Sequence, residues 1–128
     1  MQVAEKYPKI KIVIAHFFWP EVDHCYDMTH SYPNIYYDTS GLADEEVIEA
    51  TGTERIQKVL LKTLEANPRK IVFGTDYAMC NRQDHIKMIN QLPVDESVQE
   101  DVLWRNAVDL FKLPAPSAIL EKETSREK

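Results

Sequence analysis

The sequence predicts an α/β fold in which short parallel strands alternate with helices. Three nearly uninterrupted apolar runs, residues 10–15, 35–38 and 70–73, are rich in β-branched or aromatic residues. Continuous runs of this kind are typical of parallel strands covered on both faces, whereas strict alternation is typical of half-exposed strands. Helical patterns separate the runs, so crossover helices are expected to join them.

Each predicted strand leads into a residue capable of chemistry, followed by loop signals. His16 follows the first run, Asp38 closes the second and precedes Gly41, and Asp76 follows the third just after Gly74. In parallel α/β folds the functional groups collect where the strands reach their carboxyl ends. We therefore expect His16, Asp38 and Asp76 at one edge of the sheet.

Four segments are predicted to be helical, and residues 54–66 give the clearest pattern. Apolar residues there repeat at helical spacing, and Glu54 and Lys58 form an i,i+4 pair on the polar side. The preceding residues 51–54 match a capping box, and Asn67-Pro68 ends the pattern. The other predicted helices are residues 21–31, 83–90 and 97–111.

Composition indicates an acidic globular domain. The 128 residues carry a net charge of −6, which argues against a nucleic-acid partner, and the length suits one domain. The longest apolar run, residues 12–18, is interrupted by His16 and is shorter than the ~20 residues of a membrane span. No secretory signal is evident, so we expect a cytoplasmic protein in which Cys25 and Cys80 are free thiols.

Four motifs, in order, resemble the C-terminal part of the amidohydrolase-related metal-dependent hydrolases. They are Tyr7-Pro8-Lys9-Ile10-Lys11-Ile12-Val13-Ile14-Ala15-His16, Tyr32-Pro33-Asn34-Ile35-Tyr36-Tyr37-Asp38-Thr39-Ser40-Gly41, Ile71-Val72-Phe73-Gly74-Thr75-Asp76-Tyr77 and Asn106-Ala107-Val108-Asp109-Leu110-Phe111. The segment Phe73-Gly74-Thr75-Asp76-Tyr77 is the most specific of these. The resemblance implies strands six to eight of a TIM-like (β/α)₈ barrel. We expect a partial barrel domain over residues 1–113 and a polar, flexible tail over residues 114–128.

The resemblance also implies a metal-dependent site. Asp76 corresponds to the last-strand aspartate that binds the metal and helps to orient or deprotonate its water. His16 corresponds to the sixth-strand histidine, which binds metal in some members and acts as acid, base or substrate ligand in others. A divalent ion, zinc or manganese, lowers the pKa of bound water and polarises a carbonyl group.

The implied reaction is hydrolysis of an amide, ester or lactone by metal-activated water, although some relatives decarboxylate aromatic acids. The family's His-x-His pair and a further histidine would lie upstream of Met1, and this sequence contains no His-x-His. Catalytic zinc generally has three protein ligands. Two candidates are too few, so we expect weak metal retention and no turnover by the isolated chain.

Several other residues allow a structural or a functional interpretation. Asp38 and Ser40 suit a turn as well as a site, and Phe17, Phe18 and Trp19 suit core packing as well as an apolar site mouth. The remaining residues favour the structural interpretation: His24 and His30 on a surface helix, Cys80 with His85 as a weak metal pair, and Asn106 as a partner for backbone groups.

A non-catalytic role is the alternative to a small-molecule enzyme. An open three-stranded parallel sheet would leave strand edges and inward faces uncovered, which invites association. The chain could then function only as a homo-oligomer or after completion by another chain. No membrane partner is expected.

Overall fold

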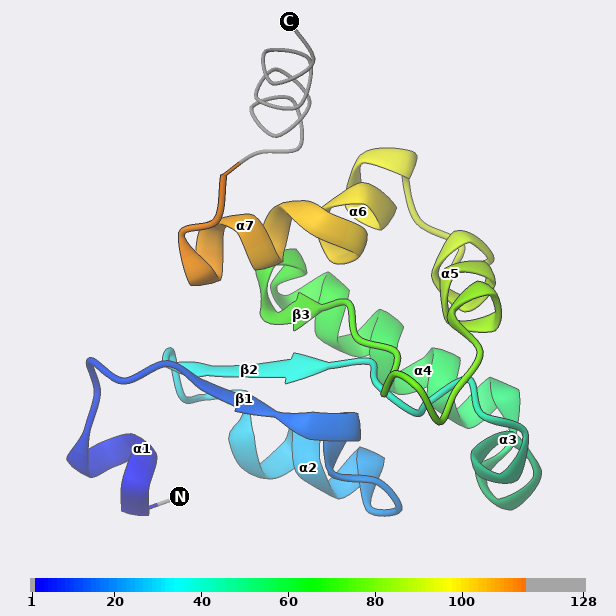
Figure 1. Ribbon diagram of the computed structural model, residues 1–128. Helices are drawn as coiled ribbons and strands as arrows, with labels where there is room; N and C mark the ends of the chain where they lie inside the picture. Colours follow the sequence, from blue (N-terminus) through cyan, green and yellow to red (C-terminus); the bar gives the residue numbers. More distant parts are fainter. Residues whose placement is uncertain (1, 115–128) are drawn as a thin grey trace, which may run out of the picture.

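The computed structural model describes residues 2–114, and its three strands form one parallel sheet (Figure 1). The strands are β1 (Ile12–Ile14), β2 (Ile35–Asp38) and β3 (Ile71–Val72), in the order β1-β2-β3. The predicted parallel α/β arrangement is confirmed. The predicted flexible tail, residues 114–128, lies outside the described residues except for Pro114.

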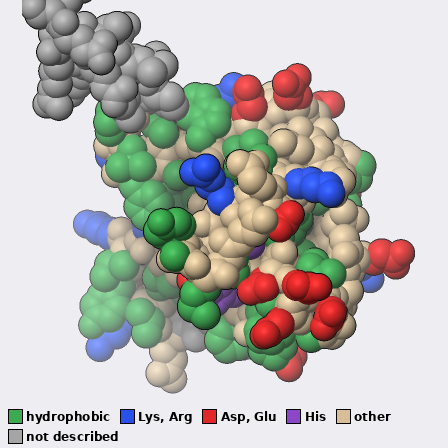
Figure 2. Space-filling view, turned by 45° about the vertical axis from the view of Figure 1, so that its right-hand side comes forward, with side chains coloured by type: hydrophobic (Ala, Val, Ile, Leu, Met, Phe, Trp, Pro, Cys, Tyr) green, Lys and Arg blue, Asp and Glu red, His purple; other side chains and the backbone are tan. Residues whose placement is uncertain are grey.

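Helices and tight turns connect the strands. They are α1 (Gln2–Lys6), η1 (Ala15–Phe18), α2 (Val22–Thr29), α3 (Glu45–Thr51), α4 (Thr53–Ala66), η2 (Pro68–Lys70), α5 (Arg82–Asn90), α6 (Glu96–Glu100), η3 (Asp101–Arg105) and α7 (Asn106–Phe111). The sequence patterns did not predict α1 or α3. Helix α3 is only seven residues long, and its apolar residues Val47 and Ile48 are only partly buried, so no extended apolar stripe marks it in the sequence. Acidic side chains gather at the lower right of Figure 2.

The strand register separates the two faces of the sheet. Ile12 is opposite Ile35, and Ile14 is opposite Tyr37, which is in turn opposite Ile71. Alternate residues point to the same face, and this set packs with the helices. The fully buried core residues include Ile35, Tyr37, Ile56, Leu60 and Ile71. Burying each large side chain contributes roughly 1.5–3 kcal/mol.

The start of α4 differs from the predicted capping box. The N-cap residue is Gly52, and no side chain caps the helix there. The Thr51 hydroxyl instead accepts a hydrogen bond from Trp19 Nε1 at 2.7 Å. The Thr51 side chain thus ties the segment after β1 to the end of α3, just before α4 begins.

The predicted helix 97–111 is present as α6, η3 and α7, with wider helical turns in η3. This segment lies along the outer edge of β3. Phe73 N–H donates to Val102 O at 3.1 Å, and Asn106 Nδ2 donates to Ile71 O at 2.7 Å. A second bond from Asn106 reaches Pro68 O, which confirms its predicted structural role. The outer backbone groups of β3 are therefore occupied.

Within the described part of the chain, no helix has both the length and the hydropathy needed to span a bilayer.

Candidate active site

A hollow of about 190 Å³ opens beyond the carboxyl ends of the strands. His16, which follows β1, and Asp76, which follows β3, both line it. The strand order thus brings the two predicted residues to one place, while their chemical roles remain predictions. The other lining residues are Trp19, Gly41, Leu42, Asp44, Val47, Met79 and Cys80.

The His16 ring is held through one nitrogen. Nδ1 lies 2.9 Å from Ser40 O and 2.9 Å from Ser40 Oγ. A carbonyl oxygen can only accept, so Nδ1 carries the proton. The neutral ring then keeps its lone pair on Nε2, the atom able to bind a metal or take up a proton.

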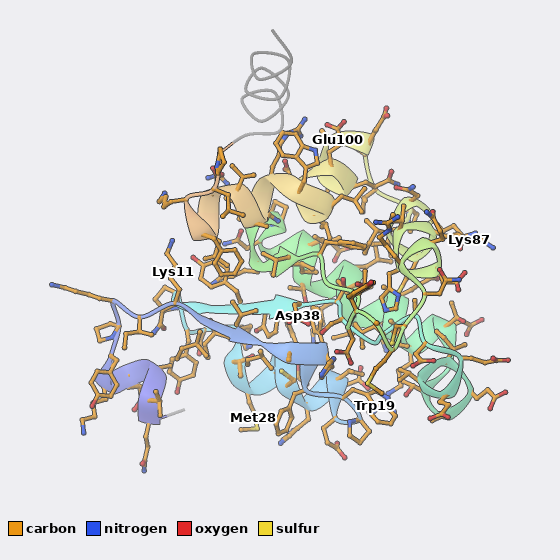
Figure 3. The ribbon with its side chains drawn as sticks, viewed as in Figure 1. Lys11, Trp19, Met28, Asp38, Lys87 and Glu100 are labelled. Atoms are coloured by element: carbon orange, nitrogen blue, oxygen red, sulfur yellow. The ribbon has the colours of Figure 1, made fainter. Side chains whose placement is uncertain are left out.

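Asp38, labelled in Figure 3, is the last residue of β2. It organises the surroundings of His16. Its Oδ1 accepts from the N–H groups of His16 and Ser40, each at 3.0 Å, and from the Ser40 hydroxyl. Because that hydroxyl donates to Asp38, its oxygen can accept from His16 Nδ1. Neither Asp38 nor Ser40 is among the residues lining the hollow. Their geometry makes them positioning residues.

The backbone around the hollow is strained. His16, Phe17 and Phe18 have φ of 55°, 47° and 57°, and Asp76 has φ of 57°. Left-handed conformations cost roughly 1–2 kcal/mol per residue outside glycine. Such strain persists only where the surrounding contacts fix it, and it concentrates at functional sites.

Two glycines allow the close packing of this region. Gly41 has φ of +70°, and a Cβ there would lie 3.3 Å from His16 Nδ1. A Cβ at Gly74 would lie 3.2 Å from Ser40 Cβ. The loops after β2 and β3 can therefore approach each other and the imidazole.

Asp76 presents its carboxylate without a side-chain partner among the described residues. Its backbone oxygen accepts from Met79 N–H at 2.9 Å, while the side chain makes no ion pair with the described cations. Asp76 does not cap the next helix. Asn81 caps α5, with its side chain accepting from Gln83 N–H at 2.9 Å. The Asp76 carboxylate is available for a ligand.

The aromatic segment after His16 divides between core and site. Phe17 is fully buried and stacks on Tyr37 with ring centroids 4.7 Å apart. Trp19 lines the hollow, whereas Phe18 is 61% exposed and faces a different hollow. Packing is therefore the role of Phe17. The apolar mouth comes from Trp19, Val47 and Met79, and the fully buried Leu42 forms part of the wall behind them.

Asp44 and Cys80 form a pair in the hollow that sequence reasoning missed. Cys80 Sγ donates to Asp44 Oδ2 at 3.2 Å. Burial, followed by the hydrogen bond and charge of Asp44, raises the pKa of Cys80 to about 11. The thiol is therefore protonated near neutral pH, a poor state for binding metal. One feature of the sequence could have pointed to this pair. Asp44 lies in the loop after the second predicted strand, a few residues beyond Asp38 and Ser40.

The remaining histidines have other surroundings. His24 on α2 and His30 at its C-cap are exposed, as predicted. His85 is fully buried, and its Nδ1 donates to Asn81 O at 2.9 Å while Nε2 accepts from Ala43 N–H at 3.3 Å. Those two bonds link α5 to the loop after β2 and occupy both ring nitrogens of His85. His85 therefore cannot bind a metal ion together with Cys80.

The donor set suits part of a metal site. Imidazole nitrogen and carboxylate oxygen are ligands for zinc and manganese. His16 Nε2 and the Asp76 carboxylate supply one of each at the same hollow. Residues 2–114 contain no group of three or more histidine, cysteine or acidic side chains placed to hold an ion. The described residues therefore fit a shared ion only if further ligands come from elsewhere.

Similar proteins span a much longer barrel. The chain is 25% identical over 119 residues to the γ-resorcylate decarboxylase of Polaromonas sp. strain JS666, covering 85% of this chain and 36% of that protein. A dihydroxybenzoic acid decarboxylase structure from Polaromonas sp. JS666, with manganese and the inhibitor 2-nitroresorcinol bound, matches with TM-score 0.62 and 22% identity. The match covers 88% of this chain and 37% of that structure.

Another solved structure gives the same picture of the fold. A TIM-barrel protein from Bordetella bronchiseptica matches with TM-score 0.65 and 22% identity, covering 87% of this chain and 37% of that one. The fold is therefore part of a TIM-like barrel. The family model described as amidohydrolase matches residues 2–113. The chain belongs to the amidohydrolase family.

Proposed function

We propose that this chain carries part of the active site of a metal-dependent decarboxylase acting on a hydroxylated aromatic acid. The observation that carries the proposal is the meeting of His16 and Asp76 in one hollow with an apolar mouth. Further support comes from the relatives, which include a γ-resorcylate decarboxylase and a manganese-bound dihydroxybenzoic acid decarboxylase.

The net reaction replaces a ring carboxylate by a proton. The ring carbon gains the proton, its bond to the carboxylate breaks, and the carboxylate leaves as CO₂ while the ring regains its aromatic electrons. A hydroxyl group ortho or para to that carbon supports the proton transfer. The chain must therefore hold an acid beside the ring and a group that orients the substrate.

His16 is suited to carry that proton. Its Nδ1 is committed to Ser40, so a proton is taken up and released at Nε2. Asp38 fixes the backbone at His16 and thus the direction of the ring. The apolar residues at the mouth reduce the water around a carboxylate, which favours its conversion into neutral CO₂.

Asp76 would hold the divalent ion, together with ligands supplied from outside the described residues. When bound, the ion neutralises and orients the oxygens of an acidic substrate. Manganese is the metal in one of the related structures.

Hydrolysis of an amide, ester or lactone is the second candidate. An unprotonated Nε2 beside a carboxylate could equally accept a proton from water. The apolar mouth and the curated relative favour decarboxylation over hydrolysis.

An experiment on a fused barrel distinguishes decarboxylation from hydrolysis. In it, this chain replaces the matched stretch of the Polaromonas γ-resorcylate decarboxylase, and the protein is loaded with manganese. We expect CO₂ release from 2,6-dihydroxybenzoate, lost at least 100-fold in Asp76→Asn and retained in Asp84→Asn, because Asp84 is exposed on α5 and does not line the hollow. A folded, manganese-loaded barrel that hydrolyses p-nitrophenyl esters or lactones and releases no CO₂ would favour the second candidate.

A further inference from the structure

The carboxylate of Asp44 is turned away from the helix that it begins. Asp44 is the N-cap residue of α3, a position where an aspartate commonly accepts hydrogen bonds from the N–H groups of the first helical turn. Its side chain makes no such bond. Oδ2 instead accepts from Cys80 Sγ at 3.2 Å, in the hollow that His16 and Asp76 line. Asp44 therefore presents its carboxylate to the candidate active site rather than to its own helix.

The second oxygen of this carboxylate is available to a ligand. Asp44 Oδ1 has no hydrogen-bond partner among residues 2–114, and no described cation pairs with the side chain. No fully buried polar side-chain atom of the described chain lacks a partner, so Oδ1 is open to the hollow or to solvent. A carboxylate accepts hydrogen bonds and repels other carboxylates. Asp44 therefore suits the hydroxyl end of an acidic substrate rather than its carboxylate end.

The indole of Trp19 is a fixed wall of the same hollow. Trp19 N–H donates to His16 O at 2.9 Å, and its ring nitrogen donates to Thr51 Oγ1 at 2.7 Å. Trp19, labelled in Figure 3, lies just beyond the carboxyl end of β1 and is 38% exposed. The ring is therefore oriented before a ligand arrives, which lowers the entropy lost on binding.

One short helix positions both groups. Asp44 directly precedes the first residue of α3, and Thr51 is the last residue of the same helix. Val47, on α3 between them, also lines the hollow. The acceptor, the anchor of the indole and part of the apolar wall are thus set by one element.

The hollow is large enough for one aromatic ring. Its volume is about 190 Å³, and an apolar cavity of about 150 Å³ binds benzene. We propose that Asp44 and Trp19 form a phenol subsite, in which the indole packs on the substrate ring and Asp44 Oδ1 accepts from a ring hydroxyl. This inference rests on the proposed function for the class of substrate. It makes Asp44 a specificity-determining residue, with Thr51 and Cys80 as positioning residues.

The subsite sets a requirement for a free hydroxyl group. A methoxy oxygen in the same place has no proton to donate, so it would face the Asp44 carboxylate as a second acceptor. Sites built to hydrogen-bond a substrate hydroxyl strongly reject analogues that lack it. The chain should therefore discriminate between a hydroxyl and a methoxy group on the same ring.

Binding to the full chain tests the subsite without metal or turnover. The probes are resorcinol and 1,3-dimethoxybenzene. The readout is the fluorescence of Trp19 in a Trp104→Phe background, where Trp19 is the sole tryptophan. We expect saturable quenching by resorcinol, with a dissociation constant at least 10-fold lower than that of 1,3-dimethoxybenzene.

Two sets of variants separate the acceptor from the aromatic wall. Asp44→Ala should abolish the preference for resorcinol, whereas Glu45→Ala should retain it, because Glu45 is exposed and does not line the hollow. Thr51→Val removes the acceptor of the indole and should weaken both probes several-fold and to a similar extent. Thr51→Ser keeps the hydroxyl and should restore the binding. Far-UV circular dichroism checks that each variant is folded.

Three results would overturn the proposal. They are equal affinity for the two probes before Asp44 is changed, a preference that survives in folded Asp44→Ala, and no quenching of Trp19 by resorcinol. An active fused barrel combined with any of these would leave the proposed function standing alone. A preference that depends on Asp44, combined with a folded fused barrel that releases no CO₂, would support the phenol subsite and reject decarboxylation.

Discussion

Removal of the Asp38 carboxylate should destabilise the fold through its effect on the His16 turn. In Asp38→Ala, the N–H groups of His16 and Ser40 and the Ser40 hydroxyl all lose their acceptor. A buried unsatisfied donor costs roughly 1–3 kcal/mol. Asp38 is half-buried and water can replace part of the loss, so we expect a decrease of about 2–3 kcal/mol in the free energy of unfolding.

Urea unfolding followed by circular dichroism measures this change. Asp23→Ala is the matched control, because Asp23 is partly exposed and pairs with Arg55 on the surface. Surface pairs contribute about 0–1 kcal/mol. If Asp38→Ala costs no more than Asp23→Ala, Asp38 does not hold the strained turn, and the account of how His16 is positioned fails.

Three further predictions concern packing and ionisation. Phe17→Ala should lower the free energy of unfolding by about 3–5 kcal/mol, because the Phe17 ring is fully buried and stacks on Tyr37. Phe18 is exposed, so Phe18→Ala should lower the free energy of unfolding much less in the same urea assay. Burial raises the pKa of Tyr37 to about 12, above the ~10 of a tyrosine in the unfolded chain. The folded chain therefore binds the phenolic proton more tightly than the unfolded chain does. The free energy of unfolding should then fall as the pH rises from about 10 to 12. Tyr37→Phe should make that fall shallower in unfolding measurements across this range, and an unchanged slope would contradict the assignment. Cys80 should react slowly with iodoacetamide at pH 8, because its pKa is raised to about 11 by burial and by Asp44. The variant Asp44→Asn should accelerate the alkylation of Cys80 several-fold, as measured by peptide mass spectrometry. No acceleration would mean that Asp44 does not stabilise the protonated thiol.

The parallel sheet was predictable because its determinants are local. Continuous apolar runs marked all three strands, and β2 has the predicted bounds. The other two strands are shorter than the predicted runs: β1 ends before the left-handed turn at His16, and β3 covers only Ile71–Val72. Short strands at the edges depend on partners that a sequence pattern does not reveal.

The site was predictable in outline only. The rule that chemistry collects at the carboxyl ends of strands led to His16 and Asp76, and both line the same hollow. Asp44 and Cys80 were missed because their contact joins residues 36 apart, which no local pattern encodes. The role of Asp38 in fixing His16 likewise depends on long-range bonds from the turn after β1.

We expect His16 and Asp76 to act on the same reacting molecule. A double-mutant cycle on kcat/KM in the fused, manganese-loaded barrel tests it most directly, with His16→Ala, Asp76→Asn and the double variant. Residues that act as a unit are strongly non-additive, so the double variant should be about as impaired as the worse single variant. Independent losses that multiply in the double variant would contradict the shared site.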